Sequence, residues 1–219
     1  MNKTFGNDDA RVAEWLYKTY EPEDEILAEI RARSAAAGLP DIQVAALDGR
    51  HLEVLARAAC ARRAVEIGTL GGYSGVSILR GLAADGELDT IDSEPRHAEV
   101  ARESFRRAGF ADRARVHVGL ALDVLPRLER RGPFDLVFID ADKEGYPRYL
   151  DWAAQNLRPG GIVLLDNAFL FGHLPESPAG ERTAAIRAMQ AVHETLARGG
   201  KFRATPLPTG EGLALGVRI

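Results

Sequence analysis

The sequence predicts a doubly wound α/β fold, in which helices cover both faces of a mostly parallel sheet. From residue 64 onward, short runs rich in β-forming residues alternate with helical patterns. The first of these runs ends in a glycine-rich turn, as expected where a strand passes into a helix. The chain has 219 residues, of which 46% are hydrophobic, so it is long and apolar enough for one α/β domain.

The expected elements follow from these patterns in chain order. The first sixty residues are predicted to be helical, with Val12, Trp15 and Leu16 at helical spacing and a further helix over 42–59. We expect strands over 64–67, 87–91, 114–118, 134–139 and 161–165, and helices over 74–84, 95–108, 121–129, 146–156 and 183–197. The last two runs, 201–207 and 213–219, are joined by a connection too short for a crossover helix. Five parallel strands and a C-terminal antiparallel hairpin then make a seven-stranded sheet with one reversed edge.

Composition and charge narrow the class of protein. The net charge of −4 and the scattered lysines and arginines disfavour a nucleic-acid surface. Cys60 is the only cysteine, which excludes an internal disulfide and a cysteine-based zinc site. Residues 1–10 lack the apolar core of a secretory signal, and no run approaches the roughly 18 apolar residues of a membrane span. We expect a cytoplasmic protein in which 1–219 form one domain, with a helical cover over 1–60 and the sheet with its helices over 61–219.

Oxygen-bearing side chains follow two of the predicted strands. They lie at the carboxyl ends of the strands, where open α/β sheets bind their ligands. Asp140-Ala141-Asp142-Lys143 follows the fourth strand, and Asp166-Asn167 follows the fifth. Carboxylate and amide oxygens are ligands of hard divalent cations, so these two strand ends predict a metal site. Taken singly, each residue is more often a helix cap, a turn residue or an exposed charge. Their joint arrangement on successive strands favours the site.

The glycine-rich turn suits a ligand with an anionic group. Gly68 and Gly72 allow close backbone approach, and the N–H groups that open the next helix favour negative charge. The spacing departs from the G-x-G-x-x-G dinucleotide pattern, so a turn without a ligand stays open as an alternative. Asp92 ends the second strand and is suited to the two hydroxyls of a ribose, although Asp is also common in turns. Glu66 sits inside an apolar strand, where a buried carboxylate needs a cation or a donor, such as a ligand's amino group.

Three segments together resemble the signature of a known family. Glu66-Ile67-Gly68-Thr69-Leu70-Gly71-Gly72-Tyr73-Ser74, Phe138-Ile139-Asp140-Ala141-Asp142-Lys143 and Asp166-Asn167 are similar in order and spacing to those of the cation-dependent O-methyltransferases. That family includes caffeoyl-CoA and catechol O-methyltransferases and their small bacterial relatives, and the resemblance covers roughly residues 40–219. It implies a Rossmann-like sheet and methyl transfer from S-adenosylmethionine (SAM) to a hydroxyl of a small phenolic, catechol-like acceptor. It further implies a divalent cation, Mg²⁺ before Mn²⁺ or Ca²⁺, and a homodimer.

The resemblance also implies roles for individual residues. Those implied to bind the cofactor are Val44, Glu66, Gly68, Ser74, Asp92, Ala121, Asp140 and Asp142. Those implied to bind the metal are Asp140, Asp166 and Asn167. Lys143 is implied as the base that accepts the hydroxyl proton. Val44 would approach the methionine end of SAM through its backbone, and Ser74 would hydrogen-bond the cofactor carboxylate.

Two departures from the family pattern bear on the ligands. Leu120 stands where members often have an acid, near the expected adenine position at Ala121, and Phe169-Leu170-Phe171 stands where they often have a tryptophan. We expect residues 168–180 and the N-terminal helices to roof the acceptor.

Three alternatives stay open beside this interpretation. They are a methyltransferase that needs no metal, a nucleotide-dependent oxidoreductase, and a catalytically silent binding protein. The aromatic residues Trp15, Tyr17 and Tyr20 could cover the acceptor, form a dimer surface or pack in the core. Trp152 is expected in the core. The five histidines form no pair at ligand spacing, so none is assigned to catalysis.

Overall fold

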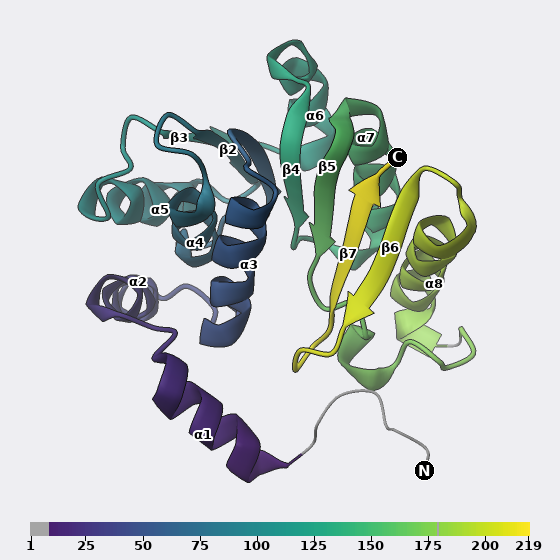
Figure 1. Cartoon of the computed structure of the whole chain (residues 1–219), viewed down its shortest axis with the longest axis horizontal. Helices are drawn as coiled ribbons and strands as arrows, with labels where there is room; N and C mark the ends of the chain where they lie inside the picture. Colours follow the sequence, from purple (N-terminus) through teal and green to yellow (C-terminus); the bar gives the residue numbers. More distant parts are fainter. Residues whose placement is uncertain (1–8, 179) are drawn as a thin grey trace.

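A seven-stranded sheet with helices on both faces forms the centre of the molecule (Figure 1), as seen in a computed structural model that describes residues 9–178 and 180–219. The strands are β1 (Arg63–Ile67), β2 (Glu87–Asp92), β3 (Ala114–Val118), β4 (Phe134–Ile139), β5 (Leu157–Leu165), β6 (Phe202–Leu207) and β7 (Leu213–Arg218). Their order is β3-β2-β1-β4-β5-β7-β6. The pairs among β1 to β5 are parallel, and β7 pairs antiparallel with β5 and β6. The predicted fold class is therefore confirmed.

Eight α-helices connect or precede the strands within the described residues. They are α1 (Ala10–Tyr20), α2 (Glu25–Ala36), α3 (Ala46–Ala58), α4 (Tyr73–Gly81), α5 (Pro95–Arg107), α6 (Ala121–Leu128), α7 (Tyr146–Asn156) and α8 (Thr183–Arg198). The expectation about a secretory signal falls almost wholly on residues 1–8, outside the described residues. In the described part of the chain, no helix is long and apolar enough to cross a bilayer.

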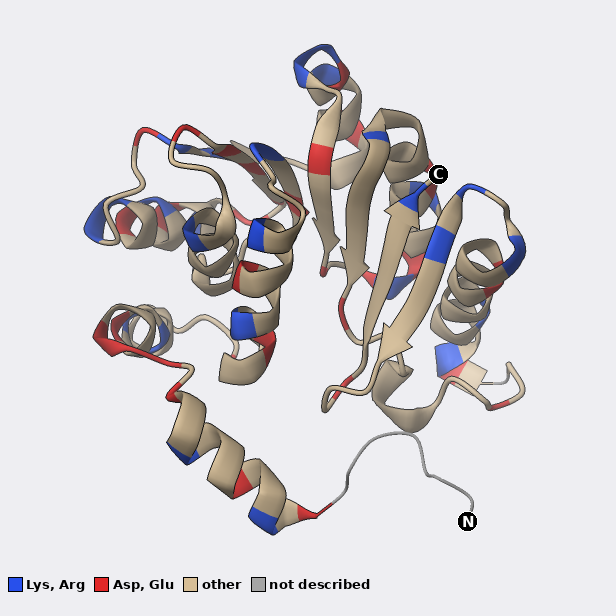
Figure 2. Cartoon of the chain, in the orientation of Figure 1, with Lys and Arg blue, Asp and Glu red and all other residues tan. Residues whose placement is uncertain are grey.

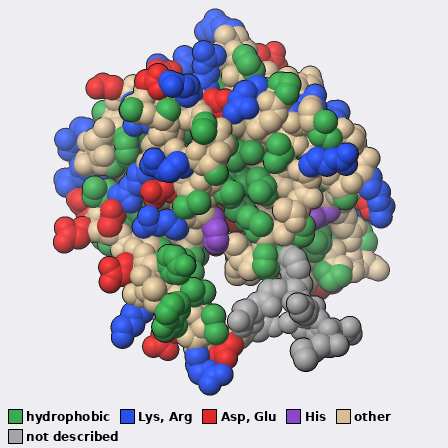
Figure 3. Space-filling model, viewed as in Figure 1, with side chains coloured by type: hydrophobic (Ala, Val, Ile, Leu, Met, Phe, Trp, Pro, Cys, Tyr) green, Lys and Arg blue, Asp and Glu red, His purple; other side chains and the backbone are tan. Residues whose placement is uncertain are grey.

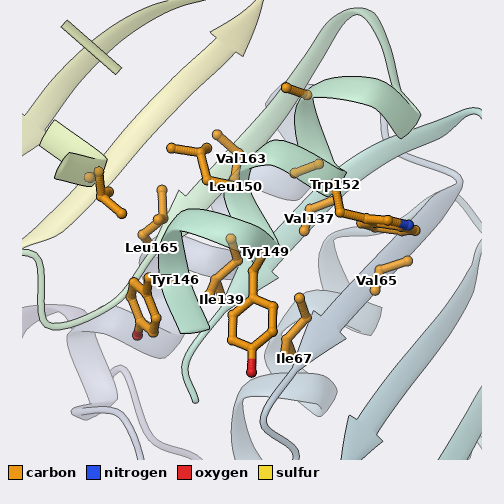
Figure 4. Close-up of a cluster of buried hydrophobic side chains, with 14 of the residues drawn as sticks. Val65, Ile67, Val137, Ile139, Tyr146, Tyr149, Leu150, Trp152, Val163 and Leu165 are labelled. Carbon is orange, nitrogen blue, oxygen red and sulfur yellow. The ribbon is translucent and has the colours of Figure 1, made fainter. Parts of the chain in front are cut away.

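Alternation along each strand divides the core into two apolar clusters, one on each face of the sheet. Val65, Val137 and Val163 pack under α6, α7 and α8 (Figure 4). Leu136 and Leu164 point the other way and pack with residues of α2, α3, α4 and α5. Successive side chains of a strand point to opposite faces, so a strand buried on both faces is apolar throughout, as the sequence predicts here.

Three details of the sheet and its cover differ from expectation. The reversed strand is β7, which lies one strand in from the edge, because β7 buries Leu213 and Ala214 whereas β6 is mostly exposed. Strand β5 begins at Leu157, earlier than expected, and Gly160 with φ +76° accompanies a shift of register against β4. Helix α3 begins at Ala46, because residues 42–45 are not helical and the N-cap residue Ala45 has an extended backbone.

Helix α1 leaves an apolar face exposed. It buries none of its residues, and the side chains of Trp15 and Tyr20 are each 61% exposed. Figure 3 shows hydrophobic side chains gathered over this helix, which lies on the side of the sheet toward which β4 and β5 point (Figure 1). Core packing of these aromatics is therefore wrong within this chain, whereas Trp152 is buried against Phe134 as expected.

Candidate functional site

The glycine-rich turn after β1 touches the end of β4. Gly68 has φ +101°, a conformation that favours glycine, and a Cβ atom there would lie 1.9 Å from the carbonyl oxygen of Asp140. The Asp140 N–H in turn donates to the Ile67 carbonyl at 2.8 Å. The expected cofactor turn and the expected metal ligand are therefore in direct backbone contact, at the carboxyl ends of two neighbouring parallel strands.

Glu66 is fully buried on the face of β1 opposite Val65 and Ile67. Its carboxylate accepts hydrogen bonds from the Ser74 and Thr90 hydroxyls, each at 2.6 Å. Burial is the main cause that raises the pKa of Glu66 to about 8, against the two hydroxyl donors, which lower it. The partners of this carboxylate are thus hydroxyls of the protein, and Ser74, expected to meet the cofactor carboxylate, here binds Glu66.

Asp92 joins the end of β2 to the glycine-rich turn. Its Oδ2 accepts from the backbone N–H groups of Thr69 and Leu70, at 3.2 and 2.8 Å. Its Oδ1 lies 2.9 Å from the Glu94 N–H and 3.1 Å from His97 Nδ1. The expected ribose ligand therefore lies at the turn, where it also fixes the backbone that would approach the cofactor.

The three expected metal ligands end adjacent strands. Asp140 follows β4, and Asp166 with Asn167 follows β5, whose register aligns Ile139 with Leu165. Asn167 has φ +50°, a left-handed conformation that Asn tolerates better than most residues. Among residues 9–178 and 180–219, no three His, Cys, Asp or Glu side chains gather as a metal centre. The expected set has only two carboxylates and takes its third oxygen from an amide.

Burial disfavours the charged forms of Asp140 and Asp166, and at Asp166 the charge of Asp140 adds to this effect. Desolvation, followed by the charge of Asp140, raises the pKa of Asp166 to about 7. Desolvation also raises the pKa of Asp140, against the opposing effect of Lys143. The carboxylate of Asp48, on α3, adds further negative potential at Asp166. In Figure 2, acidic residues follow the ends of β4 and β5, while lysines and arginines are spread over many elements.

Lys143 lies directly against the expected metal ligands. Its Nζ donates to Asp140 Oδ1 at 3.2 Å and to the Tyr146 hydroxyl at 2.6 Å. The Tyr146 hydroxyl donates onward to the Asp166 carbonyl at 3.2 Å. Tyr146 itself is fully buried, so the ammonium group is held by a rigid neighbour. The lysine is therefore fixed between both strand ends.

Asp142 points to the same end of the sheet as the tyrosines of α7. Its Oδ1 accepts from the Tyr149 hydroxyl at 2.6 Å, and its Oδ2 accepts from the Gly145 N–H at 2.8 Å. Figure 4 shows the rings of Tyr146 and Tyr149 at one end of the apolar cluster, with their hydroxyls directed away from it. The aromatic rings thus anchor α7 in the core while their hydroxyls orient the polar groups after β4.

Two expected cofactor residues lie at the borders of this region. Val44 is buried in the irregular segment before α3. Ala121 begins α6 after β3, and the Gly119 N–H ties that strand end to the Asp92 carbonyl at 2.9 Å. Leu120, which replaces the family's common acid, is 65% exposed.

Sequence reasoning missed several residues that support the site. Tyr146 and Tyr149 could have been found from the helical spacing of three and seven residues that separates them from Lys143 and Asp142. His97, five residues after Asp92, carries no comparable signal, because a histidine on a helix is usually solvated.

Comparison with known proteins identifies the family of the chain. The model of the O-methyltransferase family matches residues 17–219. A catechol O-methyltransferase of Mycobacterium tuberculosis is 47% identical over 181 residues, which is 82% of each chain. Among solved structures, an O-methyltransferase of Bacillus cereus in complex with SAH is 34% identical with a TM-score of 0.89, covering 95% of this chain and 97% of that one. The O-methyltransferase TomG of Streptomyces achromogenes, involved in tomaymycin synthesis and solved with SAM, is 38% identical with a TM-score of 0.86, covering 95% and 96%.

The match over nearly the whole chain excludes the oxidoreductase alternative and favours an enzyme over a silent binding protein. It agrees with the resemblance carried by the turn after β1 and by the ends of β4 and β5. The chain therefore belongs to the cation-dependent O-methyltransferase family and is an O-methyltransferase.

Proposed function

We propose that this enzyme transfers the methyl group of SAM to a hydroxyl of a small phenolic, catechol-like acceptor, with help from a divalent cation. The observation that carries the proposal is the contact of Lys143 with Asp140, beside the buried carboxyl of Asp166 and next to the Gly68 turn. The names of the relatives, a catechol O-methyltransferase and enzymes solved with SAM or SAH, support the donor and the class of acceptor.

The donor set suits a hard divalent cation. Asp140, Asp166 and Asn167 offer two carboxylates and an amide oxygen, the ligand types that Mg²⁺ prefers and that Mn²⁺ or Ca²⁺ also accepts. The charge of Asp140 helps to raise the pKa of Asp166, and a bound cation would relieve this repulsion. A bound cation of this kind would acidify and orient a coordinated hydroxyl.

The remaining work falls to the side chains of the chain. The acceptor oxygen attacks the methyl carbon as the carbon–sulfur bond breaks, and the bonding electrons go to sulfur. Holding the oxygen in line with that bond can contribute about 7–11 kcal/mol. We assign Lys143 as the group that takes the hydroxyl proton, which requires its neutral amine form and leaves it as the ammonium, and Tyr146, 2.6 Å from Nζ, holds it in place.

We further propose cofactor contacts by Val44, Glu66, Gly68, Ser74, Asp92, Ala121, Asp140 and Asp142. We propose that residues after Asn167 and the N-terminal helices cover the acceptor. Support comes from Phe171, 59% exposed after β5, and from the exposed aromatic face of α1 on the same side of the sheet. The family resemblance also favours a homodimer, for which the face of α1 offers an apolar surface. Light scattering of the wild type and of Trp15→Ala tests this state.

The decisive experiment is a methyl-transfer assay over catechols, caffeoyl derivatives and flavonoids, with and without Mg²⁺. We expect turnover of a vicinal diol that stops in excess EDTA and returns when Mg²⁺ is added. Full activity after confirmed removal of metal would overturn the metal-assisted mechanism and leave the metal-free methyltransferase.

Substitution of the base tests its assignment separately. Lys143→Ala and Asp140→Ala should each abolish turnover, while Lys143→Ala leaves SAM affinity largely unchanged. Lys201→Ala is the matched control, because the side chain of Lys201 forms an exposed ion pair with Asp151, and the substitution leaves its backbone contacts in place. If Lys143→Ala retained wild-type kcat, another group would have to accept the proton.

A further inference from the structure

Helix α2 contacts two segments that border the proposed cofactor pocket. The first is the glycine-rich turn, where a Cβ atom at Gly71 would lie 2.0 Å from the Ser34 hydroxyl oxygen of α2. The second is the irregular segment 41–45, where Arg31 Nη2 donates to the Val44 carbonyl at 3.3 Å. Helix α2 therefore supports both segments that would contact the methionine end of SAM, the glycine-rich turn and residues 41–45.

Arg31 is itself held by two other side chains. Its Nε donates to Glu23 Oε1 at 2.9 Å, and the same oxygen accepts from the Tyr73 hydroxyl at 2.8 Å. The guanidinium group also stacks over the Tyr73 ring, 4.5 Å from its centroid. Tyr73 is almost fully buried at the start of α4, immediately before Ser74. The side chains of Glu23, Arg31 and Tyr73 thus form a cluster that connects α2 to the glycine-rich turn and to Val44.

We propose that Arg31, with Glu23 and Tyr73 as its supports, is a positioning residue for SAM that fixes the Val44 backbone against the glycine-rich turn. The proposal rests on the proposed function in one respect, the approach of Val44 to the methionine end. Arg31 itself need not touch the cofactor. It acts because residues 42–44 lie outside any helix or strand, so the Val44 carbonyl takes its hydrogen bond from the Arg31 side chain and not from a helix or sheet.

The contacts of Arg31 differ from those of a residue that only docks α2 onto the protein. Arg33, two residues along α2, also ties the helix to the body of the protein, through the Ser104 hydroxyl at 3.2 Å and an ion pair with Glu29 at 2.7 Å. Those contacts lead to α5 and to α2 itself, and not to segment 41–45. Both arginines contribute to the docking of α2, but only Arg31 reaches Val44.

The test compares Arg31→Met with Arg33→Met. SAM affinity is measured by isothermal titration calorimetry, thermal stability by melting, and steady-state kinetics at varied SAM concentration. A hydrogen bond from a charged donor is typically strong enough for Arg31→Met to raise the Kd and KM for SAM about tenfold, with kcat at saturating SAM unchanged. Arg33→Met should lower the melting temperature by about as much as Arg31→Met does. It should leave the Kd for SAM within twofold of wild type. Arg31→Lys should recover part of the affinity.

Two results would overturn the proposal: an unchanged Kd for SAM in Arg31→Met, or an equal loss of affinity in both variants. Failure of the wild type to bind SAM would instead defeat the proposed function, so the two failures are distinguishable. Should Arg31→Met not fold, Tyr73→Phe decides on the same criterion. It removes the hydroxyl that holds Glu23 and keeps the ring under Arg31, and it should weaken SAM binding several-fold.

Discussion

Glu66→Gln tests whether a buried, protonated carboxyl sets the pH dependence of folding. The side chain is fully buried and its pKa is raised from 4.5 to about 8. Each pKa unit corresponds to about 1.36 kcal/mol, so the ionised carboxylate costs the free protein about 5 kcal/mol. That amount is comparable to the whole stability of many small proteins.

The sign follows from proton binding. Between pH 4.5 and about 8 the folded state holds the proton of Glu66 while the unfolded state has lost it. The contribution of Glu66 to the free energy of unfolding therefore falls as pH rises through this window and is constant on either side. Glutamine cannot ionise, so the variant should gain stability relative to wild type, by about 5 kcal/mol between pH 4.5 and pH 9.

Urea unfolding of the free protein in EDTA, at half-unit steps from pH 4.5 to pH 9, measures this difference. Asp166, whose pKa is raised to about 7, affects both proteins alike and cancels. Glu194→Gln is the matched control, because Glu194 is 62% exposed and paired only with Arg198. Parallel stability curves for wild type and Glu66→Gln would refute the reasoning.

Three further predictions concern the strand ends. Asp166→Asn should weaken Mg²⁺ binding at least tenfold in a thermal-shift titration, since it removes one of two anionic donors; an unchanged midpoint would place the cation elsewhere. Tyr149→Phe should raise the Kd for SAM about three- to tenfold in calorimetry, because it removes the 2.6 Å hydrogen bond from the Tyr149 hydroxyl to Asp142. An unchanged Kd would contradict a cofactor role for Asp142. Gly68→Ala should lower the melting temperature by more than about 8 °C or abolish soluble expression, because its Cβ would meet the Asp140 carbonyl at 1.9 Å. A melting curve like that of wild type would show that the turn relaxes.

The sequence predicts the sheet well because each strand carries its own evidence. Apolar runs bounded by glycine or acidic residues place β1 to β5 within a few residues, and Asp140 and Asp166 follow from the rule that parallel strands end at one edge. These are local signals, readable within one segment of the chain.

Contacts between distant segments carry no such signal. The hydrogen bond between Glu23 and Tyr73 joins residues fifty positions apart, and nothing in the sequence around either residue predicts this contact. The exposure of Trp15 is of the same kind: helical spacing predicts α1, but not that the body of the chain leaves its apolar face uncovered. The local role of Asp92 in holding the Thr69 and Leu70 amides also depends on packing that one sequence does not contain.

The backbone contact between Gly68 and Asp140 would couple the proposed cofactor site to the proposed metal site. A cofactor that settles on the turn after β1 presses on the same backbone that carries the first proposed metal ligand. If SAM selects one position of that turn, it shifts the affinity for the cation by some factor. Thermodynamic reciprocity then requires the cation to shift the affinity for SAM by the same factor. If both proposed ligands bind here, the absence of a side chain at Gly68 would make SAM and the cation heterotropic effectors of each other.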